Sequence, residues 1–282
     1  MQTQADWRAG TGNWAYFNIP LEDVFEAARE WKNILAGVGK PWLCWSVSPA
    51  WCLIQQKLVK RVGWVPVVGF DPKYEPPQLV PGAIQIDFNS KLKLPQMWSH
   101  FPLEFAWLYA PKLAFWHADL LCRFSMMEDA AKLFEKLTDG EMAAVWDYGG
   151  FRRLLNRKMH RYWEVLGCMT HGASKDNFEK GCGWWRHIDC HPSVATEAAR
   201  QERRKLFYDH GQGIMYWKRH YGGRVREISL RRAVEGHCSE IGNKNYRVLP
   251  GHTEHSRNVG KEMELNYDIE QVCRRLGIQS LL

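Results

Sequence analysis

His117 and Asp119 are the first two side chains in this sequence whose types and spacing suggest chemistry. They interrupt an apolar segment from Lys112 to Cys122, which we expect to be a buried strand. Alternate residues of a strand point to one face, so the imidazole and the carboxylate could hold one cation. Mn²⁺ or Mg²⁺ would suit this pair, with a phosphate as a further ligand. By its spacing alone, however, the pair is better explained as a buried hydrogen-bonded His–Asp pair.

The segments before this pair alternate between strands and helices. We expect strands at residues 41–48, 65–71 and 83–88, and helices at residues 21–35 and 49–62. Apolar strands that alternate with helices predict an α/β fold, with a mostly parallel central sheet flanked by helices.

The alternation continues around the central segment. We expect helices at residues 101–109 and 126–137, a strand at residues 141–147, and a last helix at residues 269–276. The chain therefore reads as one large α/β domain, with residues 112–122 as a central strand.

The carboxyl ends of the predicted strands are the expected place for a ligand, because sheets of this type bind ligands there. Ser46, Ser48, Asp71 and Asp87 would lie at this edge, together with the flat rings of Trp45 and Trp116. We expect the two serines, Asp71 and the two rings to contact a bound ligand. No Gly-rich phosphate loop follows any of these strands. A metal and basic side chains would therefore have to hold a bound phosphate.

Composition narrows the class of protein. The 282 residues carry a formal net charge of +7, which favours an anionic partner, although a merely basic soluble protein fits equally. Fifteen tryptophans indicate either an aromatic core or a groove lined with flat rings. We see no signal peptide and no apolar run near the roughly 18 residues of a spanning helix, so we expect a soluble, cytoplasmic protein without a membrane partner.

The α/β half, the His/Asp element at the end of a central strand and the absence of a Gly-rich loop together resemble the GT-A class of nucleotide-sugar glycosyltransferases. In that class a D-x-D-like motif holds a divalent cation on the sugar diphosphate. Residues 115–119 stand in the equivalent place, with His117 in the position of the first acid. The resemblance implies a metal-dependent hexosyltransferase that uses Mn²⁺ or Mg²⁺ and a nucleotide sugar, with a UDP-sugar favoured.

A later segment, residues 208–217, is similar to the acid and helix found late in retaining members, such as the blood-group-type galactosyltransferases. The resemblance implies that Asp209 lies beside the sugar, where it could stabilise the oxocarbenium-like centre. His210 could then accept or relay the acceptor proton. Without the family, Asp209 would be read as a helix N-cap with a neighbouring surface histidine.

Residues 234–239 resemble the late histidine segment from which many GT-A enzymes supply a third metal ligand. The resemblance assigns this role to His237, which would otherwise be read as a surface-loop histidine. It also implies a division of the chain: residues 1–150 bind the nucleotide sugar, residues 151–243 form the acceptor and catalytic side, and residues 244–282 form a C-terminal strap or tail.

The Gly- and Trp-containing segment at residues 181–192 resembles the acceptor side of the GT-A cleft. Trp184 and Trp185 would stack on a sugar or a base, Arg186 would meet an anion, and Asp189 would supply an acid.

Structural zinc is a competing interpretation of the same region. Four nitrogen or sulfur donors suffice for such a site, and residues 168–191 contain more than four. The candidates are Cys168, His171, Cys182, His187, Cys190 and His191. Their spacing matches no standard C-x₂-C pair, and buried cysteines with solvated histidines are the simpler interpretation.

Two basic clusters, within residues 152–161 and 200–205, could follow the phosphates of a nucleic acid, although such runs are often only solvated faces. The chain resembles the soluble glycosyltransferases that modify hydroxymethylated pyrimidines in viral or kinetoplastid DNA. This implies a hydroxymethylated base in DNA as the acceptor, and the host cytoplasm as location if the protein is viral. The alternatives are a GT-A enzyme acting on a glycan, polysaccharide or protein, and a non-enzymatic zinc-containing nucleic-acid-binding protein.

Overall fold

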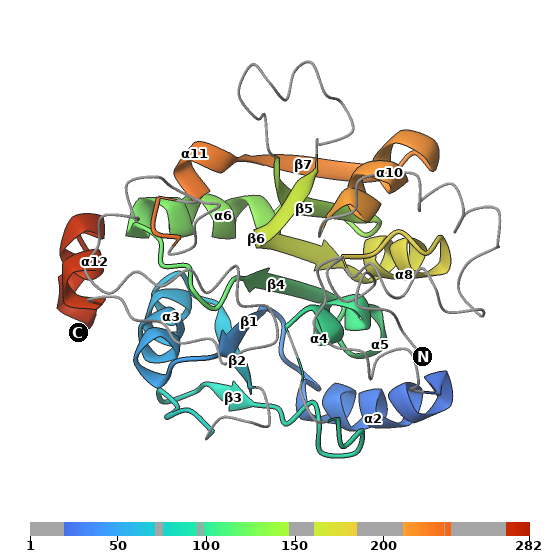
Figure 1. Ribbon diagram of the computed structural model, residues 1–282, viewed down its shortest axis with the longest axis horizontal. Coiled ribbons are helices and arrows are strands. Elements are labelled where there is room, and N and C mark those ends of the chain that lie inside the picture. Colours follow the sequence, from blue (N-terminus) through green and yellow to red (C-terminus); the bar gives the residue numbers. More distant parts are fainter. Residues whose placement is uncertain are drawn as a thin grey trace, which may run out of the picture.

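A computed structural model of the chain describes residues 20–70, 76–94, 97, 99–146, 161–184, 211–233, 235–237 and 269–282. The described residues contain one seven-stranded sheet in the order β3-β2-β1-β4-β6-β5-β7, with helices on both faces (Figure 1). Every neighbouring pair is parallel except the two pairs that involve β6. The predicted α/β fold with a mostly parallel central sheet is therefore confirmed.

Four strands form the half of the sheet that the first part of the chain supplies. They are β1 (Pro41–Ser46), β2 (Val65–Phe70), β3 (Ile84–Gln85) and β4 (Lys112–Trp116). All six residues of β1 are buried, as expected for a central strand that is covered on both faces.

The other half of the sheet contains β5 (Glu141–Trp146), β6 (Tyr162–Thr170) and β7 (Arg224–Ser229). β6 runs antiparallel between β4 and β5, so its first residues lie at the edge where the other strands end. β7 is the edge strand, and its mostly exposed, charged side chains blunt that edge.

One face of the sheet is covered by helices that share a hydrophobic core with residues such as Trp42 and Cys44. Four helices of this layer are α3 (Pro49–Arg61), α6 (Phe124–Glu135), α11 (Leu230–Ala233) and α12 (Ile269–Leu276). The short 3₁₀ helix η6 (Gln279–Leu281) follows α12, and Lys57 Nζ donates to the Leu281 carbonyl at 2.6 Å.

The opposite face carries a second core, to which Leu43 and Trp45 belong because side chains alternate along β1. The helices on this face are α2 (Leu21–Ile34), α4 (His100–Glu104), α5 (Ala106–Tyr109), α8 (His171–Glu179) and α10 (Gln212–His220). α2 starts after Pro20 and buries Val24, Ala27, Ala28 and Trp31, which recur at helical spacing.

Three expectations need correction. The predicted strand at residues 112–122 ends at Trp116, because the chain turns there and Leu120 N donates to the His117 carbonyl at 3.2 Å. β6 was not predicted at all. Arg161, which the sequence placed in the first basic cluster, lies buried just before β6 and stacks its guanidinium over the Trp163 ring, 4.4 Å from its centroid.

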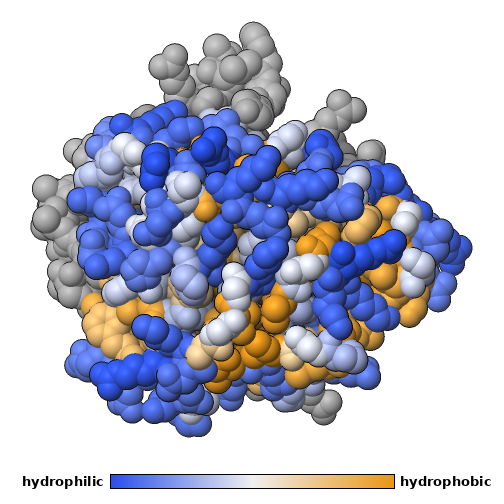
Figure 2. Space-filling view, turned by 180° about the vertical axis from the view of Figure 1, so that it is seen from behind, coloured by the Kyte–Doolittle hydropathy of each residue, from blue (hydrophilic) through white to orange (hydrophobic). Residues whose placement is uncertain are grey.

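The surface of the described part is largely polar. The face in Figure 2 is mostly hydrophilic, with hydrophobic residues gathered along its lower part. Among the described residues, the large hydrophobic side chains that are exposed are Phe25, Ile34, Leu79, Tyr221 and Leu282. None of the described helices combines the length and the apolar character that crossing a membrane requires.

Candidate metal centre

The turn that follows β4 places the first two candidate ligands. His117 N donates to the Val165 carbonyl of β6 at 3.0 Å, which holds the residue against the antiparallel strand. Gln55 of α3 is fully buried, and its Nε2 donates to the carbonyls of His117 at 2.8 Å and Leu120 at 2.9 Å. One glutamine of α3 therefore fixes the backbone on both sides of Asp119.

His237 reaches the same place from far along the chain. It forms an isolated antiparallel bridge with Leu120, and Leu121 N donates to the Gly236 carbonyl at 3.2 Å. A Cβ at Gly236 would lie 1.8 Å from the Leu121 carbonyl oxygen, so only glycine allows this approach.

Side chains on either side of the bridge hold the two segments together. Arg123 Nε and Nη2 donate to the two carboxylate oxygens of Glu235 at 2.8 and 2.6 Å. The same Nη2 donates to the Arg275 carbonyl of α12 at 3.0 Å. A bidentate Arg–carboxylate pair has a well-defined geometry, so the position of His237 relative to Leu120 is specified.

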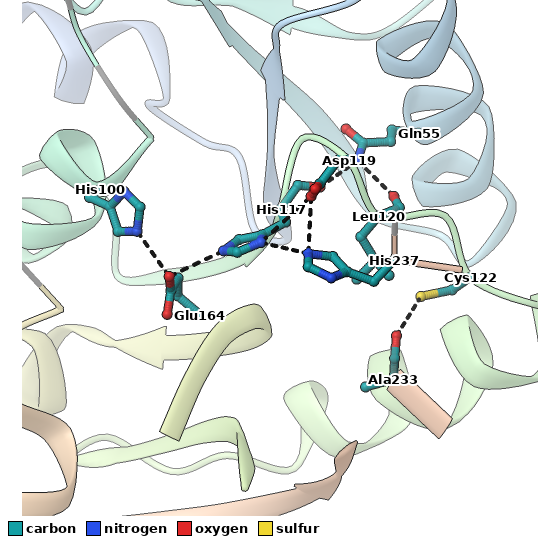
Figure 3. A network of polar contacts seen from close by, with 9 residues as sticks. All are labelled: Gln55, His100, His117, Asp119, Leu120, Cys122, Glu164, Ala233 and His237. Atoms are coloured by element: carbon teal, nitrogen blue, oxygen red, sulfur yellow. Dashed lines mark hydrogen bonds and ion pairs between the residues drawn. The ribbon is translucent and has the colours of Figure 1, made fainter. Parts of the chain in front are cut away.

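The three predicted metal ligands meet at this bridge (Figure 3). His117 Nδ1 lies 2.9 Å from His237 Nε2, and Asp119 Oδ1 lies 3.1 Å from the same His237 nitrogen. Asp119 Oδ1 is 3.6 Å from His117 Nδ1. One donor atom from each residue falls within 4.8 Å of the others, as donors around one ion must.

A further carboxylate and a third imidazole lie on the other side of His117. Glu164 of β6 has its Oε1 3.2 Å from His117 Nε2, and the His100 Nε2 is hydrogen-bonded to the same oxygen at 3.2 Å. In Figure 3 His117 stands between Glu164 on one side and the Asp119–His237 pair on the other. His100, Glu164, Asp119 and His237 are all buried.

Electrostatics at the site favour positive charge. Burial lowers the pKa of His117, but the carboxylates of Asp119 and Glu164 outweigh it and raise this pKa to about 10. Without a bound metal ion, the His117 ring is therefore protonated on both nitrogens and positively charged at neutral pH. A divalent cation at Nδ1 would displace the proton there and take over the neutralisation of the two carboxylates.

The donor set fits a divalent transition metal. Two imidazoles and one carboxylate suit Mn²⁺ and neighbouring first-row ions better than Mg²⁺, which prefers oxygen ligands. Three protein donors also leave coordination positions for a phosphate or for water. His117, Asp119 and His237 are the residues that would hold the ion.

The predicted donor-binding residues fall into two groups. Trp45 and Trp116 are core residues, each 2% exposed, with Trp116 packed against Trp42 and Trp45 against Phe88. Their rings leave no free face for a ligand, so the prediction that they stack on a donor is not supported. Ser46 lies buried at the end of β1 and Ser48 directly precedes α3, which is the strand edge where we expected both.

Trp184 is also a core residue. It is 1% exposed, packs edge-on against Phe115 and donates from Nε1 to the Met169 sulfur at 3.1 Å. Its ring is therefore not open to an acceptor, and the predicted stacking role is not supported.

The described zinc candidates are not assembled. Cys168 belongs to the core on one face of the sheet and Cys182 to the core on the other, while His171 is exposed at the start of α8. One ion cannot take both cysteines. Burial also raises the pKa of the Cys168 thiol, which disfavours the thiolate that zinc needs.

Several predicted site residues lie outside the described residues. They are the donor residue Asp71, the acceptor residues Trp185 and Arg186, the catalytic candidates Asp189, Asp209 and His210, and the zinc candidates His187, Cys190 and His191.

Sequence reasoning missed three residues of the site: Gln55, His100 and Glu164. Glu164 carried a signal, since it is a lone acid within the apolar run of residues 162–169, as His117 and Asp119 are in their own run. Gln55 and His100 carried none, because nothing in their local sequence distinguishes them from surface residues of a helix.

No protein-family model, no curated protein and no solved structure matches this chain. The functional proposal therefore depends on the chemistry of the site.

Proposed function

We propose that this protein is a metal-dependent glycosyltransferase of GT-A type, which moves a sugar from a nucleotide-sugar donor, with a UDP-sugar favoured, to a hydroxyl acceptor. One observation carries the proposal. His117, Asp119 and His237, selected by the resemblance as the metal ligands, have donor atoms within 4.8 Å of one another although His237 is distant in sequence.

The position of the cluster supports the proposal. It lies just beyond the carboxyl end of β4, beside the first residues of the antiparallel β6. Ligands of such sheets bind at this edge, and a chain without a Gly-rich phosphate loop needs another way to hold a diphosphate. A bound divalent cation would supply Lewis-acid stabilisation of the departing diphosphate.

The residues of the chain have separable roles in this proposal. His117, Asp119 and His237 hold the ion, while Gln55 keeps the turn that carries the first two in place. Ser48 is half-buried at the same strand edge, where its hydroxyl could bind the nucleotide, whereas the Ser46 side chain is only 1% exposed and belongs to the interior.

The proposed catalytic pair, Asp209 and His210, directly precedes Gly211 in the sequence. The Gly211 carbonyl accepts a hydrogen bond from Tyr162 N at 3.4 Å, and Tyr162 is the first residue of β6. In this proposal Asp209 stabilises the positive charge that develops at the anomeric carbon, and His210 takes the proton of the acceptor hydroxyl. Asp189 is kept as a further acid on the acceptor side.

For the acceptor we propose a hydroxymethylated base in DNA. The net charge of +7 and the basic clusters within residues 152–158 and 200–205, without the buried Arg161, support an anionic acceptor. An enzyme of this kind must extrude the base from the stack before transfer, which an aromatic side chain such as Trp185 would assist.

The test is nucleotide release from a panel of UDP-, GDP- and other sugar nucleotides, with Mn²⁺, with Mg²⁺ and with a chelator. The active donor is then incubated with hydroxymethylated and with unmodified DNA. We expect release that needs the metal, is faster with Mn²⁺ than with Mg²⁺ and is stimulated only by the hydroxymethylated DNA.

Other outcomes select other functions. Metal-dependent release that glycans or proteins stimulate, with little effect of salt, would select a GT-A enzyme with that acceptor. No release from any donor, together with stoichiometric zinc in the purified protein, would replace the enzyme by a zinc-containing nucleic-acid-binding protein.

The donor set itself favours one second candidate. Two imidazoles and one carboxylate are also the set that holds iron in non-haem Fe(II) oxygenases. Oxygen consumption by the Fe²⁺-loaded protein that exceeds oxidation of the bound Fe²⁺, with an organic co-substrate as the reductant and without any nucleotide sugar, would favour this function over sugar transfer.

A further inference from the structure

Glu164 is a buried carboxylate that lies beside a proposed metal ligand and has no role in the function proposed above. Its side chain is 8% exposed and projects from β6 toward His117 (Figure 3). Isolated carboxylates are costly to bury, so the groups around Glu164 indicate what the residue does.

The two ring nitrogens of His117 have different surroundings. Nδ1 lies 2.9 Å from His237 Nε2 and 3.6 Å from Asp119 Oδ1, which is the side where a cation would sit. Nε2 lies 3.2 Å from Glu164 Oε1 on the opposite side. A neutral imidazole that offers the lone pair of Nδ1 to a cation must carry its proton on Nε2, and a carboxylate there favours this tautomer.

We propose that Glu164 is a positioning residue for the metal centre. It orients the His117 ring and keeps the proton on Nε2, so that Nδ1 faces the cation. The inference deepens the proposed function and rests on that part of it which places a cation on His117.

His100 completes the arrangement by holding Glu164. Its Nε2 is hydrogen-bonded to the same oxygen, Oε1, that lies beside His117, at 3.2 Å. His100 is 5% exposed and belongs to α4, on the core side of the site. A carboxylate contacted by two buried imidazoles has little freedom to rotate, so the direction of the His117 ring is set by two elements, α4 and β6.

Two other roles for Glu164 make different predictions. As a catalytic group it would have to touch the substrate, whereas its Oε1 is turned toward two histidines. As a ligand it could hold a second ion together with His100 and His117, whose donor atoms also lie within 4.8 Å of its own. His117 would then have to bind both ions through its two nitrogens, which requires loss of both ring protons.

The experiment measures Mn²⁺ binding by electron paramagnetic resonance of the free ion, without any sugar nucleotide. Glu164→Gln should bind Mn²⁺ about 10- to 100-fold more weakly than the wild type, the loss typical of removing a carboxylate behind a histidine ligand. His100→Gln should lose severalfold. Glu141→Gln is the matched control, because Glu141 is equally buried in a strand of the same sheet but bonds to Arg226 and Thr138; its affinity should be unchanged.

A second readout does not depend on affinity. In the protein loaded with diamagnetic Zn²⁺, histidine ¹⁵N NMR should show the His117 proton on Nε2 in the wild type. Glu164→Gln should lose this single tautomer. Circular dichroism identifies a variant that fails to fold, and in that case His100→Gln carries the test.

The outcomes separate this inference from the proposed function. Unchanged Mn²⁺ affinity in Glu164→Gln overturns the inference, whether or not sugar transfer is lost, since loss of transfer alone would make Glu164 catalytic. Two Mn²⁺ ions per wild-type chain and one in the variant would overturn it in favour of a second site. A wild type that binds no Mn²⁺ overturns both proposals. If the variants show the expected Mn²⁺ affinities but the protein transfers no sugar, the glycosyltransferase proposal is overturned and the role of Glu164 in metal binding stands.

Discussion

Two buried glutamates of the same sheet, Glu141 and Glu164, show how the side where the parallel strands begin differs from the side where they end. Glu141 begins β5 at the amino edge and accepts hydrogen bonds from Thr138 N and Thr138 Oγ1, both at 3.0 Å, and from Arg226 Nη2 at 2.9 Å. The backbone hydrogen bond from Thr138 is the largest cause that holds the Glu141 pKa below its usual range. Glu164, at the carboxyl edge, instead faces His100 and His117.

The difference lies in the partners. An amide, a hydroxyl and a guanidinium keep their protons at neutral pH, so the Glu141 network has one state and stabilises the fold. Imidazoles can instead exchange a ring proton for a metal ion, so the network around Glu164 has a metal-free and a metal-bound state. Burial of a carboxylate therefore does not identify a functional site, whereas partners that can bind a metal ion do.

Asp119→Ala should have the largest effect on the carboxyl edge. It removes one of three ligands, so we expect Mn²⁺ affinity to fall at least about 100-fold, beyond the loss from a supporting residue, and donor hydrolysis to disappear. Isothermal titration with Mn²⁺ measures the first and nucleotide release the second. Asp129→Ala is the control, because Asp129 is paired with Arg232 on the surface. A variant with wild-type affinity and turnover would remove the His117–Asp119 pair from the metal centre.

Gly236→Ala tests whether the β-bridge between Leu120 and His237 positions His237 for metal binding. A Cβ there would lie 1.8 Å from the Leu121 carbonyl oxygen, so the segment has to shift. We expect a loss of about 1–3 kcal/mol of unfolding free energy and about tenfold weaker Mn²⁺ binding. Urea unfolding and Mn²⁺ titration measure the two effects. Gly39→Ala, where nothing lies within 4 Å of the added Cβ, should change neither. Equal Mn²⁺ affinity in both variants would show that the bridge does not position His237.

Glu141→Ala should affect stability and leave metal binding unchanged. Because the pKa of Glu141 is lowered in the folded state, its stabilisation is present above the unfolded pKa and is lost as the pH falls through the folded pKa. At pH 7 we expect a loss of about 1.5–3 kcal/mol, since the lost hydrogen bonds involve a charged group. The gap to the wild type should narrow below about pH 4, where the free carboxyl also titrates. Urea unfolding at several pH values measures this difference in unfolding free energy. A difference that does not change with pH would contradict stabilisation by the ionised Glu141 carboxylate.

The sequence predicted the alternating part of the chain well, and the reason is local. Apolar runs bounded by turn residues identified β1, β2 and β5 to within two residues, and the start but not the end of β4, because period and composition are properties of neighbouring residues. β6 was missed, since its apolar run contains Glu164 and begins after a basic segment. The same locality explains why the sequence did not predict that Trp45, Trp116 and Trp184 are buried, because residue type does not show whether a ring faces a ligand or the core.

Sequence alone determined that the chain is α/β and that His117 and Asp119 stand beside each other at the end of a central strand. The fold class follows from hydrophobic period. The proximity of His117 and Asp119 follows from their spacing of two residues, although both lie in the turn after β4 and not on one face of a strand. Only the tertiary structure decided that His237 joins them, that Glu164 and His100 stand behind His117, and that Gln55 holds the turn. These contacts join residues up to 120 positions apart. They depend on an antiparallel strand within a parallel sheet and on a glycine against a carbonyl, features that neighbouring residues do not encode.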